Sequence, residues 1–380
     1  MSMIKSTLQT LFNELEAPKL SRQFGQGWIS GVFALLFSII SFCLVLILHY
    51  PDVLTVPEIR DQVDVPFIRN VLMLIIVCGF LLACISMILR QNKIFGLSAA
   101  GLLLLSIVLG GVATQKTAEF SGDMYLGLDW FILNLLITGI LFLPLERMFR
   151  RVDQSVFRFE WREDLFYFLI SSIFVQSLTF LSMLPAMTLL SFNMLISVKN
   201  LVAAQSVWLQ FIEIMFLTDF VQYWLHRFFH QTPFLWKFHA VHHSAQAMDW
   251  LAGSRMHVME IIVLRGLTII PMYILGFSET AIYAYIIMVY LYATFVHANL
   301  KFDIEWLKPI IVTPRFHHWH HGVEKEAVDV NFSVHFPIFD RLFGTYYMPE
   351  KKWPAAYGIG GHPVPRGYIK QFLYPFSKKK

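Results

Sequence analysis

Long apolar stretches recur along this chain, and they constrain its fold more than any other feature. A helix needs roughly 20 apolar residues to cross the hydrocarbon core of a bilayer. Because backbone polar groups in that core must bond within their own segment, such stretches favour helices. We predict an all-α, polytopic membrane protein with eight spans, at residues 27–50, 69–89, 94–114, 128–148, 165–192, 206–228, 258–276 and 279–298.

Composition supports a membrane protein and excludes two other classes. Hydrophobic residues make up 56% of the chain and charged residues only 15%, whereas soluble domains carry about 25% charged residues. The net charge of +4 is too small to indicate a nucleic-acid partner, which we exclude. All three cysteines lie inside apolar stretches, a pattern that predicts neither a disulfide framework nor an iron–sulfur site.

Residues 1–26 precede the first span. Leu8, Leu11, Phe12 and Leu15 recur there at helical spacing, which predicts either a short amphipathic helix in the membrane interface or an ordinary packed leader helix. Residues 27–150 then form a region of four spans without a chemical motif, and we interpret them as lipid-facing scaffold.

Charges in the connecting loops predict the orientation. The loops after the first and third spans are acidic, whereas residues 90–93 and 146–164 are rich in arginine. Since Lys and Arg accumulate on the cytoplasmic side, eight spans place both termini inside the cell. The same topology brings every histidine cluster to the cytoplasmic face, as a helical cap on the spans.

The histidines are concentrated in one part of the chain, where twelve of the fourteen fall between His226 and His335. At 3.6 residues per turn, the spacings within HRFFH, HAVHH and HHWHH keep most of their imidazoles on one helical face. His318 alone is turned away from its neighbours, and the roles of His257 and His335 stay open. Nine histidines fit two metal ions better than one four-coordinate zinc; nitrogen ligands suit iron, zinc, copper or nickel.

These three boxes and their flanks resemble a known family. HRFFH, HAVHH and HHWHH, with DFVQYWLHR, SRMHVME and VDVNFSVHFPIFDRLFGTYY around them, are similar to the fatty acid hydroxylase/sterol desaturase superfamily of membrane-bound di-iron oxygenases. The resemblance covers roughly residues 205–350. Val258 and Phe339 depart from the proline and tryptophan that are usual at their positions, and neither is a ligand position.

The resemblance implies a catalytic region at residues 151–350, followed by a cytoplasmic tail at 351–380. It also implies the metal ligands, which are His226, His230, His239, His242, His243, His297, His317, His320 and His321.

Acidic and amide side chains are candidates for supporting these ligands. Asp219 lies two helical turns before His226, and an acid within a span is a functional candidate. Asn331 and Asp340 are supporting residues by resemblance only. Glu260 and Arg265 share a span and either pair with each other or support the site.

The family chemistry implies two iron ions and O2, acting on a C–H bond of a sterol or fatty-acyl type lipid that enters from the bilayer. Hydroxylation and desaturation both remain open. No flavin or nicotinamide fingerprint is present, so a separate protein is expected to supply electrons. Two alternatives are a histidine-rich metal transporter, which needs polar groups through the membrane midplane, and a non-catalytic metal-binding membrane protein.

The predicted topology is testable with two reporters of membrane sidedness. A reporter fused after residue 380 and another inserted in the loop at 51–65 are expected on opposite sides of the membrane, because an odd number of predicted spans separates them. Protease accessibility of each reporter in sealed vesicles measures this. Finding both on one side would contradict the predicted spans.

Overall fold

The computed structural model of this chain describes residues 2–15, 17–18, 23–62, 64–114, 116, 125–174, 177–182, 196–302, 306–361 and 363–377. Over these ranges the secondary structure is helical, with only two isolated β-bridges and no named strand. The all-α prediction is therefore confirmed. The chain forms two compact units, Met1–Leu133 and Asn134–Lys380.

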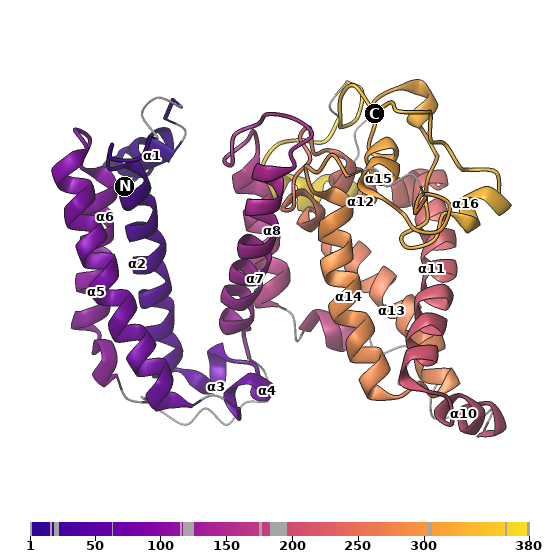
Figure 1. Ribbon diagram of the computed structural model, residues 1–380, viewed down its shortest axis with the longest axis horizontal. Coiled ribbons are helices and arrows are strands. Elements are labelled where there is room, and N and C mark those ends of the chain that lie inside the picture. The colour runs from indigo at the N-terminus through magenta and orange to yellow at the C-terminus, as the bar shows by residue number, and fades with distance from the viewer. Residues whose placement is uncertain are drawn as a thin grey trace. The chain divides into compact units, whose positions relative to one another are not determined.

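The first unit is a bundle built around three long helices. Its elements are α1 (Ser2–Leu15), α2 (Trp28–His49), α3 (Pro51–Leu54), α4 (Pro57–Arg60), α5 (Val65–Leu89), α6 (Ile94–Val108) and η2 (Gly111–Ala113). Figure 1 shows α2, α5 and α6 side by side. They meet at Ala34, Ala83 and Ala99, all fully buried, because small side chains let membrane helices approach closely. The helix expected within residues 1–26 is present as α1; its place in the interface stays a prediction.

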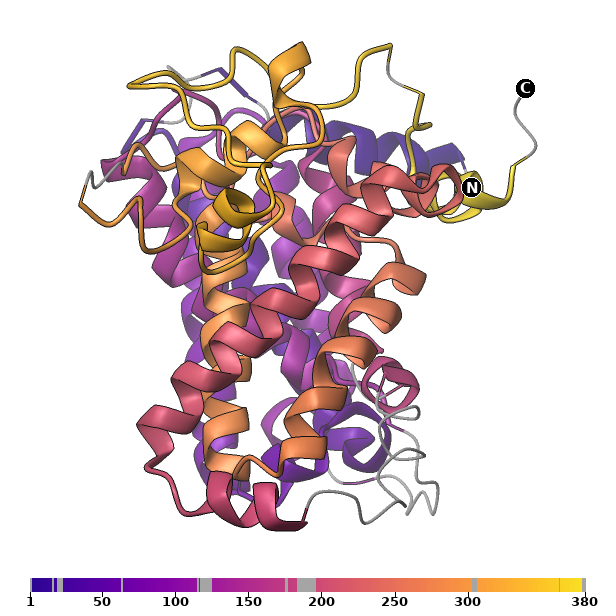
Figure 2. The same cartoon turned by 90° about the vertical axis from the view of Figure 1, so that its right-hand side faces the viewer.

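The second unit carries the histidines. After α7 (Leu128–Met148), which begins in the first unit, its elements are α8 (Trp161–Ile173), α10 (Ile196–Ala203), α11 (Val207–Gln231), α12 (Pro233–His243), η3 (Ala252–Ser254), α13 (Val258–Leu275), α14 (Glu279–His297), α15 (Pro314–His320), η4 (Lys325–Ala327), α16 (Ile338–Leu342), α17 (Tyr368–Leu373) and η5 (Tyr374–Phe376). Helices α11, α13 and α14 run side by side, and α12 and α15 lie across one end of them (Figures 1 and 2).

Prolines and caps set the boundaries that position the histidines. Pro233 cannot continue the helix before it, so α11 ends at Gln231 and α12 starts in a new direction. Thr313 caps α15, where its side-chain oxygen accepts from the backbone N–H of Phe316 at 3.4 Å, and Pro314 occupies the first turn. Both short histidine helices thus begin at a proline, which fixes where their histidines start.

Six of the eight predicted spans are confirmed as helices long and apolar enough to cross a membrane: α2, α5, the stretch Ile94–Ala113, α7, α13 and α14. The predicted span at 206–228 corresponds to α11, which is not among these six helices. Although α11 has 25 residues, Gln210, Glu213 and Asp219 dilute its apolar character. In the predicted span at 165–192, α8 ends at Ile173, and residues 175–176 and 183–192 lie outside the described part.

The close packing of helices in the first unit leads to a prediction about its stability. A Cβ at Gly31 would lie 2.5 Å from Ser86 Oγ and 2.8 Å from the Phe95 side chain. We expect Gly31→Ala to destabilise the unit by about 1–3 kcal/mol, because those helices must move apart. Gly101→Ala is the control, since nothing lies within 4 Å of its Cβ position, and helix propensity should make it neutral or stabilising by up to about 1 kcal/mol. Unfolding in mixed micelles measures both; equal destabilisation would contradict the packing.

Candidate metal centre

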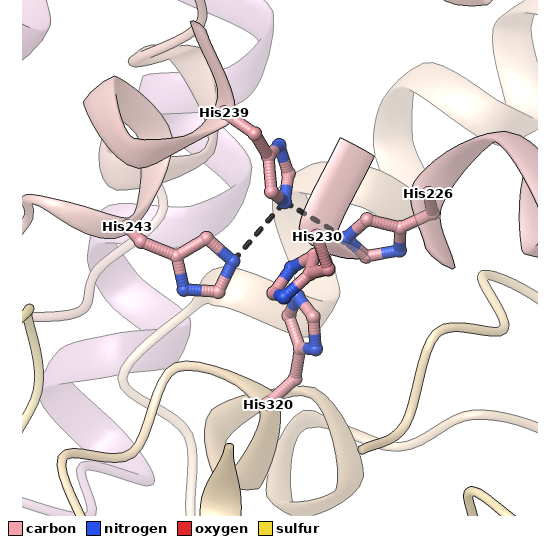
Figure 3. Close-up of side chains that lie close together, drawn as sticks. All are labelled: His226, His230, His239, His243 and His320. Carbon is pink, nitrogen blue, oxygen red and sulfur yellow. Dashed lines mark hydrogen bonds between the residues drawn. The ribbon is translucent and has the colours of Figure 1, made fainter. Parts of the chain in front are cut away.

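The structure gathers all nine histidines that were predicted as ligands. They form two groups, each with ring nitrogens within 4.8 Å of one another. The five-histidine group consists of His226, His230, His239, His243 and His320, and Figure 3 shows their rings pointing toward one another. The four-histidine group consists of His242, His297, His317 and His321.

Helical spacing explains the membership of each group. His226 and His230 are one turn apart on α11, and His239 and His243 are one turn apart on α12. Neighbouring residues, however, divide between the groups: His242 joins the four-histidine group while His243 joins the other. His320 and His321 divide in the same way. The two groups therefore adjoin, and the rings of His243 and His321 stack at 4.4 Å.

Hydrogen bonds to outer groups fix the tautomers in the five-histidine group. The Nδ1–H of His226 donates to the carbonyl oxygen of Phe332 at 2.8 Å, and that of His320 donates to the carbonyl oxygen of Val330 at 2.7 Å. His239 donates through Nδ1 to the carboxylate of Glu260 at 2.5 Å. Because the two carbonyl oxygens have no proton to give, Nδ1 of His226 and of His320 carries the hydrogen and Nε2 of each keeps its lone pair.

The four-histidine group has the same construction. His242 donates through Nδ1 to the carbonyl oxygen of Arg255 at 3.0 Å, and His297 donates to that of Ala293 at 2.6 Å. Their Nε2 atoms then face each other at 3.2 Å. The Nε2 of His317 lies 2.9 Å from that of His297 and 3.2 Å from that of His321.

The ring nitrogens of each group point toward one another, as the ligands of a bound cation do. In the five-histidine group the Nε2 atoms of His226 and His239 are 2.9 Å apart, so two lone pairs face each other, and only a cation makes that arrangement attractive. The Nε2 atoms of His230 and His320 are buried without a hydrogen-bond partner among the described residues. Within that part of the chain no carboxylate belongs to either group, so each donor set is all nitrogen.

Burial keeps these imidazoles neutral. It lowers the pKa of His239, His243 and His317 well below the ordinary 6.5, and neighbouring histidines lower it further. A neutral imidazole is the form that ligates a metal. Both groups are therefore ready to bind metal at neutral pH without losing protons.

The remaining histidines of this region have structural partners. His318 lies outside both groups, as its helical position predicts, and its two nitrogens contact the Tyr357 hydroxyl at 2.7 Å and the His297 carbonyl oxygen at 3.2 Å. His257 caps α13 and contacts the carbonyl oxygen of Phe372. His335 contacts the Tyr285 hydroxyl at 3.3 Å. His257 and His335 also belong to neither group.

The three predicted supporting residues brace the loop that follows the last histidine box. Asp219 accepts from the backbone N–H groups of Val334 and Phe336. Asp340 accepts from the N–H of Phe332 at 2.8 Å, and the carbonyl of that same residue holds His226. Asp340 therefore acts on His226 through the backbone, whereas Asp219 fixes the loop two residues farther along.

Asn331 ties this loop to α15. Its side chain donates to the carbonyl oxygens of Phe316 and Tyr347 and accepts from the Tyr347 N–H. Its φ of 58° lies in the left-handed region, where asparagine is better tolerated than most residues. The residue therefore holds the turn beside His317.

Sequence analysis left one supporting element open and missed another. Glu260, for which pairing with Arg265 and support of the site were both open, bonds His239 directly. A buried ion network was missed: Arg158 lies 2.6 Å from both Asp164 and Asp249, and Arg255 bonds Asp164. This network fixes the backbone of Arg255, whose carbonyl orients His242. In the sequence, the acid of SRMHVME, which is Glu260, was the only signal for these supporting elements.

The fold and the two groups define a multi-pass membrane protein with an all-histidine candidate metal centre. Residues 211–345 match the fatty acid hydroxylase family. Together with the relatives, this match places the region of residues 211–345 in the fatty acid hydroxylase/sterol desaturase superfamily.

Three relatives illustrate the range of that superfamily. The chain is 31% identical over 164 residues to ornithine lipid hydroxylase OlsE of Rhizobium tropici, covering 43% of this chain and 49% of the relative. It is 28% identical over 276 residues to the alkylglycerol monooxygenase of Danio rerio, covering 72% and 51%. It is 30% identical over 149 residues to the Delta(7)-sterol 5(6)-desaturase ERG3A of Gibberella zeae, covering 37% and 39%.

The chain thus spans about half the length, or less, of these relatives. No solved structure matches it.

Alanine substitutions in HHWHH separate ligands from bystanders. We expect His320→Ala to lose metal, because the remaining imidazoles cannot keep the same geometry. His318→Ala should retain metal and lose at most about 10–100-fold in affinity or activity, as for a residue that acts behind a ligand. Metal analysis of the purified variants measures this. Equal metal loss in both would show that this segment binds metal in another conformation.

Proposed function

We propose that this protein is a membrane oxidoreductase that uses two iron ions and O2 to hydroxylate or desaturate a C–H bond of a lipid. One observation supports this above the others: nine neutral histidines form two adjoining groups, five and four, with converging Nε2 lone pairs. The names of the relatives, which include two lipid hydroxylating enzymes and a sterol desaturase, support the reaction class.

The side chains of this protein would hold the ions and supply no redox chemistry themselves. The nine histidines of the two groups would bind the metals through Nε2, while Glu260 and backbone carbonyls hold the rings in orientation. When bound, the iron pair supplies the means to activate O2 and remove hydrogen from an unactivated C–H bond. Burial of six of the nine ligands at 1–6% exposure excludes water from the reacting region.

The overall reaction requires two electrons. Hydroxylation converts R–H, O2, two electrons and two protons into R–OH and water, whereas desaturation removes two hydrogens from neighbouring carbons and forms two waters. A separate electron-donor protein would supply the electrons. The loop charges favour the cytoplasmic side for the histidines and both termini, where a soluble donor has access.

Placement of the histidines favours an enzyme over a transporter. His226 and His230 occupy the last turns of α11, and His297 is the last residue of α14. The groups therefore lie at one end of these helices, whereas transport needs sites near the membrane midplane. A non-catalytic metal protein predicts the same ligands with no consumption of oxygen.

Metal and product analysis tests the proposal. Protein from iron-replete cells should contain about two irons per chain, one for each group, and with a chemical reductant it should consume O2 and yield an oxidised lipid. Ornithine lipids, alkylglycerols and sterols form the first panel, chosen from the relatives. Mass spectrometry distinguishes a gain of oxygen from a loss of two hydrogens.

Matched variants make this test specific. His320→Ala and His321→Ala remove one ligand from the five- and four-histidine groups respectively and should both abolish turnover, while the exposed Lys325→Ala should leave it unchanged. Tightly held zinc under all conditions without O2 consumption would favour the non-catalytic metal protein. Metal flux in sealed proteoliposomes would favour the transporter.

A further inference from the structure

The segment that follows the histidine region lies flat on the second unit. We define residues 366–377, which contain α17 and η5, as the C-terminal strap. On its inner side Gln371 is buried, where it accepts from the Tyr167 hydroxyl at 2.8 Å and donates to Glu163 at 3.0 Å. Phe372 stacks on His257, with ring centroids 5.2 Å apart. The strap is thus a fixed part of the fold.

The outer side of the strap is apolar and exposed. Ile369 is 72% exposed, Leu373 55% and Phe376 56%. Their spacing of four and then three residues puts them on one face of a helical segment. Large apolar side chains gathered on one face indicate a contact that this chain alone does not provide.

The strap adjoins the start of α13, which also exposes apolar side chains. His257, which stacks on Phe372, is the residue that caps α13, one of the six membrane-length helices. Met259 and Val263, in the first turns of α13, are also exposed. In Figure 2 the yellow strap lies at the upper end of α13 and beside α12. The strap therefore lies at the N-terminal end of a helix of membrane-spanning length.

Positive charge accompanies the apolar face. Lys370 is exposed within α17, and Lys237 of α12 donates to the carbonyl oxygen of Ser377 at 3.4 Å. The sequence continues after Ser377 with Lys378, Lys379 and Lys380. An apolar face flanked by lysines is typical of segments that lie on anionic membranes.

We propose that the C-terminal strap docks on the negatively charged surface of the same bilayer that the spans cross. Ile369, Leu373 and Phe376 enter the interface between head groups and acyl chains, and the lysines meet the phosphates of anionic phospholipids. The strap also contacts α12 and the start of α13, which carry His239 and Glu260. Lipid contact would therefore hold these two helices together at the histidine groups.

Depth-dependent fluorescence quenching tests the docking on the full chain. With the three native cysteines replaced by serine, a single cysteine at Leu373 carries an environment-sensitive dye, and a second variant carries it at Ile369. Both proteins are placed in phosphatidylcholine vesicles with or without phosphatidylserine and a lipid with a shallow spin label. We expect strong quenching at both positions, greater with phosphatidylserine and reduced to the phosphatidylcholine level by Lys370→Glu with Lys379→Glu.

Val328→Cys is the matched control, because Val328 is an apolar residue of similar exposure, 62%, in a loop outside the strap. Circular dichroism of each labelled protein checks that the helices remain. Quenching at 369 and 373 no greater than at 328 would overturn the docking. Quenching independent of phosphatidylserine would overturn the anionic surface as partner, and energy transfer between chains without lipid quenching would assign the face to a second copy. None of these readouts depends on iron or turnover.

Discussion

Mutual repulsion of unprotonated nitrogens is the constraint on which the second unit depends. Nine imidazoles are packed so closely that some Nε2 atoms approach to 2.9 Å. Each ring is held there by a hydrogen bond from its far nitrogen or by the helix that bears it. A fold that crowds lone pairs in this way is costly to form without cations. Much of the surrounding structure serves to hold the rings against this repulsion.

Two successive sets of contacts hold the histidine rings in place. Glu260 and the carbonyls of Phe332, Val330 and Arg255 touch histidines directly. Behind them, Asp340 holds the backbone of Phe332, and the ion network around Asp164 holds that of Arg255. Charged groups that do not touch a histidine therefore help to orient its ring. Removing such a group is expected to change the orientation of the imidazole.

Local spacing predicted the histidine helices well, because His226 with His230 and His239 with His243 each need only one helical turn. It could not predict that His242 turns to His297 instead of joining its own neighbours, since that depends on where α14 ends relative to α12. For the same reason, sequence left Glu260 open between Arg265 and the site and could not name His239 as its partner. The partners of Asp219 in α11 are also distant in sequence, because its carboxylate accepts from backbone N–H groups of the loop at Val334 and Phe336.

Division of adjacent residues between the two groups has a consequence for how metal is taken up. Helices α12 and α15 each supply histidines to both groups, so an ion bound in one group would order rings that belong to the other. A second ion would then meet a site whose conformational entropy is already reduced, and each ion would raise the affinity for the other by the same factor. The two groups would therefore fill together and not independently.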